Sequence, residues 1–157
     1  MNTSQLMCVI HSDPRLFASV RGVYSADQVP KYIRRGGFIA NTDVGNKPGK
    51  HWCAFYFDGF GRSEFFDSYG KPPQYYNNDF LSCLRRNSGV WIYNTKKLQS
   101  HYSNVCGQYC LYFLIHRVRG QSFGEIVKTL EESKCTDQYV YDYVTRIFPY
   151  CFTDLNS

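Results

Sequence analysis

The feature that most constrains the fold is an apolar run in the second half of the chain, Val105–Val118. Its centre, from Tyr109 to Ile115, contains no charged residue. A run of this length favours a buried helix over a strand. A helix that is apolar on every side must be covered by other elements, so the rest of the chain is expected to pack around it.

The strongest strand signal is an aromatic hairpin. Trp52–Phe57 is aromatic and extended, Asp58–Gly61 has the residues of a turn, and Ser63–Ser68 is extended again. The pattern does not define the register of the pair. Two other segments, Phe38–Thr42 and Gly89–Asn94, also predict strands.

Helices are expected towards both ends of the chain. Apolar spacing and capping residues predict them over Ser4–His11 with Ser4 as N-cap, briefly after Ser25, and over Asn78–Arg86, Ser122–Glu132 and Asp137–Phe148, the last ended by Pro149. The segment from Asp13 to Pro30 otherwise carries mixed turn signals, and Asp43–Lys50 is expected to be a loop. Strands in the middle with helices at the ends indicate an α+β fold.

The chain has 157 residues, the length of one ordinary domain, and we expect residues 1–157 to form a single one. No apolar run approaches the roughly 20 residues that span a bilayer. The first ten residues lack the pattern of a secretory signal, so an intracellular, reducing location is expected. In that setting the seven cysteines are expected to be thiols rather than a disulfide framework, and their spacing does not match a structural zinc site.

The chain is basic, with a formal net charge of +5. Its basic residues occur as short pairs: Arg34-Arg35, Arg85-Arg86 and Lys96-Lys97. Such pairs could hold the phosphates of duplex DNA or an acidic partner. An ordinary solvated basic surface explains them equally well, and no zinc-finger or helix-turn-helix pattern predicts base-specific contacts.

The start of the predicted buried helix is a candidate site. Ser103 or Asn104 could cap it, which puts Cys106 in the first turn, where free backbone N–H groups and the helix dipole stabilise a thiolate. Gly107 is expected to leave room for a substrate backbone. The alternative is that Cys106 is a small core residue, since free cysteines are often buried. Cys110, one turn later, is expected to be such a core residue.

A thiol nucleophile needs a base, and the base needs an orienting acceptor. His51 stands where a polar loop enters the aromatic strand, and Asp67 ends its partner strand, so a hairpin brings the two together. Taken singly, His51 could be a half-exposed histidine and Asp67 a turn residue. His101 is the rival base because it lies close to the candidate oxyanion residue Gln99 in the sequence.

An oxyanion hole needs preorganised donors. The backbone N–H of Cys106 is one candidate, and the side-chain amide of Gln99 is a second. By itself, Gln99 would be taken for a surface residue.

Together these residues resemble a known superfamily. His51-Trp52, Phe66–Gly70, Gln99 and Asn104–Cys110 look like the motifs of the adenain-like and Ulp-like cysteine peptidases, which include the adenovirus protease. The order His, acid, Gln, Cys is that of the superfamily. Weaker similarity lies in the flanking segments Phe38–Thr42 and 148–152, so the resemblance covers most of the chain.

The sequence departs from the adenoviral pattern in three ways. The acid is Asp67, as in Ulp-like relatives, where the adenoviral enzyme has Glu. The chain is shorter than that enzyme. Cys83 is the cysteine between the acid and Gln99, and it stands earlier than the adenoviral cysteine that binds an activating peptide through a disulfide.

The resemblance implies a papain-like fold of the adenain/Ulp type, with a central mixed sheet packed against a buried helix that starts at Cys106. It also implies a cysteine endopeptidase that uses His51, Asp67, Cys106 and Gln99 to cut viral precursor proteins after small residues such as Gly. The alternatives are a Ulp-like processing enzyme for ubiquitin-like modifiers and a catalytically silent basic DNA-binding module. No metal or cofactor is required, although DNA or a viral peptide could act as activator. A monomer with protein substrates and no membrane contact is expected, in the host nucleus or the virion if the protein is viral.

Overall fold

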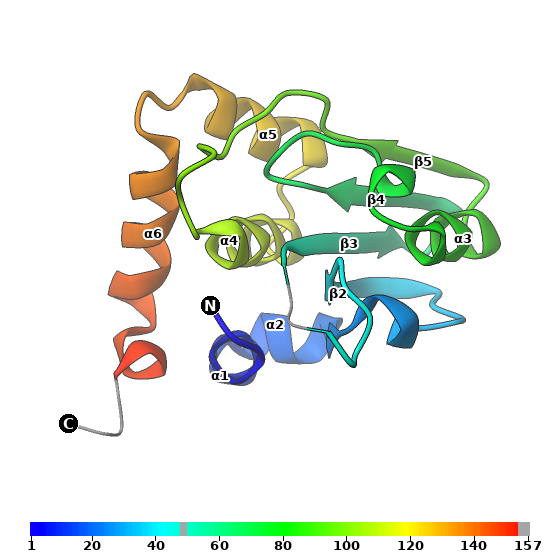
Figure 1. Cartoon of the computed structure of the whole chain (residues 1–157), viewed down its shortest axis with the longest axis horizontal. Coiled ribbons are helices and arrows are strands. Elements are labelled where there is room, and N and C mark those ends of the chain that lie inside the picture. The colour runs from blue at the N-terminus through cyan, green and yellow to red at the C-terminus, as the bar shows by residue number, and fades with distance from the viewer. Residues whose placement is uncertain (48–49, 154–157) are drawn as a thin grey trace.

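The structure is a computed structural model that describes residues 1–47 and 50–153 (Figure 1). Its helices and strands, in chain order, are α1 (Thr3–Ser12), α2 (Pro14–Ser19), β1 (Val20–Tyr24), β2 (Arg35–Asn41), β3 (Trp52–Asp58), β4 (Arg62–Phe66), α3 (Asn78–Asn87), β5 (Val90–Tyr93), α4 (Cys106–Val118), α5 (Phe123–Glu132) and α6 (Thr136–Ile147). Short 3₁₀ turns lie at Ala26–Gln28, Pro73–Tyr75 and Pro149–Phe152. The expected α+β arrangement is confirmed. Within the described residues, no helix has both the length and the apolarity to cross a membrane.

The five strands form one mixed sheet in the order β1-β2-β3-β4-β5. The two outer pairs, β1 with β2 and β4 with β5, are parallel, and the inner pairs are antiparallel. The predicted hairpin is confirmed as β3–β4, in the register that places Phe55 opposite Phe65. This register brings the residue before β3 and the residue after β4 to the same edge of the sheet.

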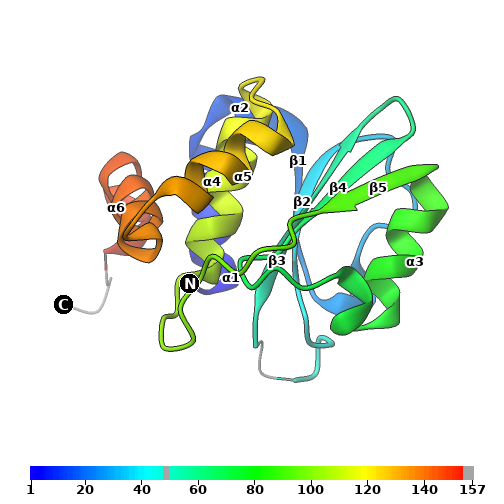
Figure 2. The same ribbon diagram turned by 90° about the horizontal axis from the view of Figure 1, so that it is seen from above.

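Helices cover both faces of the sheet (Figure 2). Alternate residues of β3 divide between two cores: Ala54 and Tyr56 join the core of α1, α4, α5 and α6, while Phe55 and Phe57 join the core of α3. Because both faces are buried, the strand is apolar at consecutive positions rather than at every second one. Helix α4 packs closely on the sheet: a Cβ added at Gly37 would lie 2.8 Å from a Leu114 methyl carbon.

The buried helix is confirmed as α4, in which every residue from Gly107 to Ile115 is buried. Cys106 is its first residue, as predicted. The expected capping by Ser103 or Asn104 is wrong, because the N-cap is Val105 and no side chain caps the helix. The Ser103 hydroxyl instead donates to the Ser100 carbonyl in the preceding turn.

Two elements near the N-terminus were not predicted. Asp13 caps α2 by accepting from the N–H groups of Arg15 and Leu16, with Pro14 as the first helical residue. β1 follows at once and pairs with β2. The first helix is capped by Asn2 rather than Ser4, in a capping box with Gln5. Residues 48–49 of the expected loop Asp43–Lys50 lie outside the described part of the chain.

The expectation that the cysteines are all thiols is wrong for two of them. Cys8 of α1 and Cys151 of the last 3₁₀ turn form a disulfide, with their Cα atoms 5.7 Å apart. They are 143 residues apart in the sequence, and tertiary packing brings them together. The other five cysteines carry free thiols.

Candidate active site

A cleft of about 650 Å³ opens beside the first residue of α4. Side chains from distant parts of the chain line it, among them Met1, His51, Trp52, Tyr69, Gln99 and Cys106. The hairpin supplies His51 and the turn with Tyr69, α4 supplies Cys106, and the loop after β5 supplies Gln99. The structure thus brings three of the four candidate residues to one cleft, with Asp67 directly behind His51.

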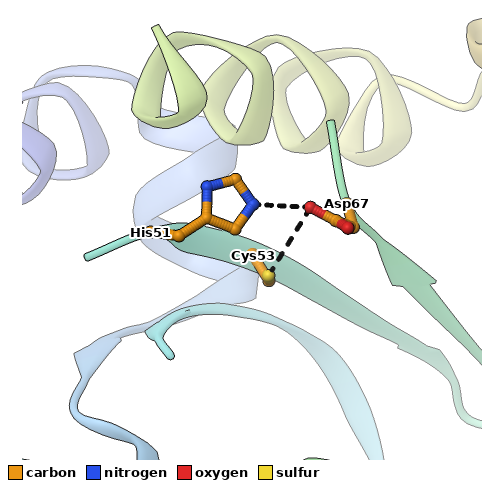
Figure 3. Close-up of side chains that lie close together, drawn as sticks. All are labelled: His51, Cys53 and Asp67. Atoms are coloured by element: carbon orange, nitrogen blue, oxygen red, sulfur yellow. Dashed lines mark hydrogen bonds and ion pairs between the residues drawn. The ribbon is translucent and has the colours of Figure 1, made fainter. Parts of the chain in front are cut away.

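His51 and Asp67 form a buried acid–base pair. His51 Nε2 lies 2.5 Å from Asp67 Oδ1, and the two side chains are 7% and 0% exposed. Figure 3 shows the imidazole edge pointing at the carboxylate. Burial disfavours the imidazolium, but the hydrogen bonds and charges of Asp67 and Cys106 outweigh it and raise the pKa of His51 to about 9. His51 is therefore held in its protonated form at neutral pH.

Asp67 is held by more groups than His51. Its Oδ2 accepts from the backbone N–H of Lys71 at 2.9 Å and from the Tyr76 hydroxyl at 2.7 Å, and its Oδ1 accepts from the Tyr69 N–H. Asn94 clamps the Asp67 backbone, accepting from its N–H at 3.0 Å and donating to its carbonyl at 2.5 Å. Burial and the neighbouring Asp67 raise the pKa of Tyr76, so its hydroxyl stays a donor. These contacts fix the carboxylate that orients the base.

The Cys106 thiol is primed to ionise. Burial opposes the thiolate, but the hydrogen bond and charge of His51 and the backbone N–H of Trp52 lower the pKa of Cys106 below its usual value. The first turn of α4 adds free N–H groups and the positive end of the helix dipole. A lowered thiol pKa beside a raised imidazole pKa favours a thiolate–imidazolium pair, the reactive form of a cysteine nucleophile.

Two aromatic rings hold the imidazole in place. The Tyr69 ring is stacked on His51 with centroids 4.7 Å apart, and the Tyr76 ring is tilted at 5.5 Å. The rival base His101 lies in an exposed turn, with its ring 6.4 Å from that of Tyr69. His51, by contrast, is hydrogen-bonded to the Cys106 thiol.

Gln99 is buried, contrary to its appearance as a surface residue. It is 2% exposed, and both ends of its amide are hydrogen-bonded inside the protein. It also lines the cleft with Cys106. Ser68, Tyr76 and Asn94, which hold Gln99 and Asp67, were not singled out from the sequence. Their contacts join residues up to 31 positions apart, so no local pattern indicates them.

The expectation that Gly107 leaves room for a substrate backbone is wrong in this structure. A Cβ added there would lie 3.0 Å from the Met1 Cβ and 3.1 Å from its Sδ. The Trp52 indole N–H donates to the Met1 carbonyl at 3.0 Å, which fixes the first residue in that place. Met1 therefore forms part of the cleft wall beside Cys106.

His51, Cys53 and Asp67 place their ligand atoms within 4.8 Å of one another, close enough to consider a metal ion (Figure 3). The ligand atoms of a tetrahedral zinc ion stand roughly 3.3 Å apart. At 2.5 Å, the His51 and Asp67 atoms are too close to share a cation without separating. Burial raises the pKa of Cys53 well above its usual value, so it is a neutral thiol. The group fits a hydrogen-bonded acid–base pair better than a metal centre.

Cys110 and Cys83, the two other cysteines considered in the sequence analysis, lie in the core. Cys110 is buried among the residues around α4, as predicted, and burial raises its pKa. Cys83 lies on the buried face of α3, and burial raises its pKa to about 11. A core thiol of this kind is poorly placed to bind an activating peptide through a disulfide.

DNA binding through the basic pairs stays a prediction. Arg85 and Arg86 lie in the last turn of α3, and the Arg86 guanidinium donates to the Lys31 carbonyl. Lys96 forms an ion pair with Glu131 at 3.6 Å. Lys96 is largely exposed and remains open to other partners.

Sequence comparison finds three similar viral proteins. A protein named as a thiol protease from Acanthamoeba polyphaga mimivirus is 30% identical over 128 residues, which are 74% of this chain and 42% of the relative. A cysteine protease of African swine fever virus is 26% identical over 123 residues, or 71% of this chain and 43% of the relative. The same protein from a second isolate, named as a SUMO-1 cysteine protease, is 25% identical over the same length. This chain thus spans less than half of each relative.

No protein-family model matches the chain. Among solved structures, the central domain of an uncharacterised Legionella pneumophila protein superposes with a TM-score of 0.53 at 14% identity, covering 96% of this chain and 97% of that one. That likeness shows a shared fold and nothing about activity. The chain therefore combines a grouping of Cys106, His51 and Asp67 at a cleft with sequence similarity, over about three quarters of its length, to viral cysteine proteases.

Proposed function

We propose that this chain is a cysteine peptidase that hydrolyses peptide bonds by acyl transfer. The observation that carries the proposal is the position of Cys106. It is the first residue of α4 and lies beside a histidine that is itself tied to a buried carboxylate. The viral proteases to which the chain is similar support the same activity.

In the first half-reaction the Cys106 thiolate attacks the carbonyl carbon of the scissile bond. The oxygen of that carbonyl takes up negative charge, which the backbone N–H of Cys106 and the free amide N–H of Gln99 stabilise. His51, already protonated, gives its proton to the leaving amine as the C–N bond breaks. The product is a thioester on Cys106 and a free amine.

In the second half-reaction water replaces the amine. His51, now neutral, takes a proton from water, and the resulting hydroxide attacks the thioester carbonyl. The bond to sulfur breaks, the acid product leaves, and Cys106 and His51 return to the thiolate–imidazolium pair. Asp67 stabilises the imidazolium whenever it forms and keeps Nε2 directed away from the substrate, without taking the proton itself.

We further propose the adenain/Ulp type of the papain-like fold, with viral precursor proteins as substrates cut after small residues. The order His51, Asp67, Gln99, Cys106 and the mixed sheet against α4 support the fold type. The mimivirus and African swine fever virus relatives are named as proteases, which supports protein substrates.

A processing enzyme for ubiquitin-like modifiers is the second candidate. The observation in its favour is that one relative carries the name SUMO-1 cysteine protease. Both candidates use the same residues and the same chemistry. They differ in the protein that enters the cleft.

A peptide library read by mass spectrometry tests the activity. Wild-type protein and the Cys135→Ala variant, which removes an exposed free thiol, are expected to cleave the library with the same profile. Cys106→Ala is expected to cleave nothing. Cleavage that persists in Cys106→Ala would overturn the proposal.

The same preparations separate the two substrate classes. Incubation with SUMO and ubiquitin conjugates, in parallel with the library, measures which is cut faster. Faster release of a modifier than of any library peptide supports the processing enzyme. A profile with small residues before the cut and no release of modifiers supports the precursor protease.

A further inference from the structure

The side-chain amide of Gln99 has a fixed orientation. Its Oε1 accepts from the Ser68 hydroxyl at 2.6 Å, and its Nε2 donates to the Ser103 carbonyl at 2.9 Å. An amide nitrogen carries two N–H groups, so one remains for another acceptor. Ser68 and Gln99 are 1% and 2% exposed, so water cannot easily replace either bond.

The Ser103 carbonyl, which can only accept, determines which end of this amide carries the nitrogen, and the Ser68 hydroxyl holds the oxygen end. The oxygen and nitrogen of an amide have nearly the same shape, and only their partners distinguish the two orientations. In the reversed orientation, Oε1 would face the Ser103 carbonyl, and two acceptors would meet without a proton. With the nitrogen bound to the Ser103 carbonyl, Ser68 donates to Oε1 and holds the amide at its other end.

The backbone of Ser68 holds the same loop. Its carbonyl accepts from the N–H groups of Leu98 at 2.8 Å and Gln99 at 2.9 Å. Gly70 makes this approach feasible, because it has φ +72° and a Cβ there would lie 2.6 Å from the Lys96 carbonyl carbon. The turn after β4 therefore docks directly on the segment that carries Gln99.

We propose that Ser68 is a positioning residue for the oxyanion donor Gln99. The inference rests on the proposed peptidase activity and adds a role to the residue after Asp67. Two consecutive residues that follow β4 then have two different positioning roles. Asp67 orients the base, and Ser68 orients the oxyanion donor. One short segment thereby sets the distance between His51 and Gln99.

A second buried serine, Ser63 of strand β4, provides a matched control. Ser63 is 0% exposed and lies at the end of β4 opposite to Ser68. Its hydroxyl lies 2.6 Å from that of Ser88, the residue that follows α3. Ser63→Ala removes the same atom and a hydrogen bond of the same length as Ser68→Ala. It does so without touching the segment that carries Gln99.

The test compares two reactions of Cys106 in wild type, Ser68→Ala, Gln99→Ala, the double variant and Ser63→Ala. Acylation by p-nitrophenyl acetate, followed as the burst of p-nitrophenolate, passes through a tetrahedral oxyanion. Alkylation by iodoacetamide, followed by peptide mass spectrometry, needs the thiolate but forms no oxyanion. If a residue acts through Gln99, its removal slows acylation. Its removal leaves the rate of alkylation, and the pH dependence of that rate, unchanged.

We expect Gln99→Ala to acylate roughly 10²-fold more slowly and Ser68→Ala about tenfold more slowly than wild type. The double variant is expected to match Gln99→Ala, because the hydroxyl has nothing left to orient. All variants are expected to alkylate at the wild-type rate, and Ser63→Ala is expected to resemble wild type in both reactions. Ser68→Thr, which keeps the hydroxyl, is expected to restore acylation.

Three results would overturn the inference: wild-type acylation by Ser68→Ala, a double variant about tenfold slower than Gln99→Ala, or equal slowing of alkylation and acylation. If Ser68→Ala fails to fold, Ser68→Cys replaces it as a weak donor of similar size, with the same outcomes expected. Failure of the proposed function looks different. In that case wild type shows no burst, or Cys106→Ala shows the same burst as wild type.

Discussion

Strand β4 and the residue that follows it carry two buried acidic residues, Glu64 and Asp67, which form ion pairs of different use. Glu64, in the middle of the strand, accepts from Arg117 at 2.8 and 3.0 Å, and the guanidinium also lies 4.4 Å from the centre of the Tyr56 ring. Asp67, just after the strand, accepts from His51 at 2.5 Å. Arg117 belongs to the last turn of α4, whereas His51 stands beside its first residue. The two pairs thus lie at opposite ends of the same helix.

The difference between the pairs is whether the cation can release its proton. An arginine stays charged at every accessible pH, so the Glu64–Arg117 pair can bind and orient but cannot transfer a proton. An imidazole gains and loses a proton in the range where enzymes work. The His51–Asp67 pair also borders the cleft and Cys106. Under the proposed function, the same kind of contact therefore stabilises the fold at one end of α4 and supports chemistry at the other.

Removing the proposed nucleophile is the change expected to distinguish the two ends of α4 most clearly. Cys106→Ala removes one sulfur atom and no packing partner of Glu64, so we expect peptide cleavage to fall by more than about 10⁴-fold. The melting temperature is expected to stay within a few degrees of wild type. Library cleavage and circular dichroism melting measure the two quantities. A variant that still cleaves would transfer the nucleophile to another cysteine, with Cys110 the first to examine.

Removing the proposed base is expected to lower kcat more than neutralising the acid that holds it. His51→Ala is expected to lower kcat by roughly 10⁴-fold, and Asp67→Asn by about 10³-fold, because Asn can still accept from the imidazole but does not stabilise its charge. Steady-state kinetics on the best library peptide measure both. If His101→Ala proves more harmful than His51→Ala, the base is assigned to the wrong histidine.

Breaking the other pair should have the opposite signature. Glu64→Gln leaves Arg117 without its charged partner in a largely buried position, and we expect it to destabilise the protein by about 2 kcal/mol. Because the pair lies at the far end of α4, kcat is expected to stay within about twofold of wild type. Urea unfolding and steady-state kinetics on one preparation check this. A loss of kcat comparable to that of Asp67→Asn would remove the distinction between the two pairs.

Local patterns indicated where three of the candidate site residues lie, and the resemblance to a peptidase superfamily gave them their expected roles. A hairpin turn places His51 and Asp67 together, and the start of an apolar helix presents Cys106, so each position follows from nearby sequence. The prediction of Gln99 as an oxyanion donor depended on the resemblance to the peptidase superfamily, because nothing in the neighbouring sequence distinguishes a buried amide from an exposed one. What the sequence could not indicate is how these residues are held.

The parts that escaped prediction depend on contacts between distant segments. Ser68 bonds to Gln99 across 31 positions, and Asn94 bonds to Asp67 across 27. Strand β1 has a weak local pattern and is defined by its parallel pairing with β2. The Cys8–Cys151 disulfide joins the two ends of the chain, and composition alone argued against it.

The central claim is that Cys106 and His51 exist as a thiolate–imidazolium pair. The lowered pKa of Cys106 makes its thiolate available below the usual range for a cysteine, and His51 keeps its proton until the pH reaches about 9. As the pH is increased, the alkylation rate of Cys106 is therefore expected to rise in the acidic range and to stay level through neutral pH. It is expected to change again near pH 9, where His51 loses its proton. A thiol without such a partner is mostly protonated at pH 6 and reacts slowly.

The most direct test is a limited iodoacetamide pulse at pH 6, followed by mass-spectrometric mapping of every free cysteine. The exposed thiol of Cys135 is the internal reference, since it is freely accessible to the reagent. The account predicts that Cys106 is alkylated first, at least about 10-fold faster than Cys135, and that His51→Ala removes this advantage. Alkylation of Cys135 ahead of Cys106, or a fast Cys106 that does not depend on His51, would contradict it.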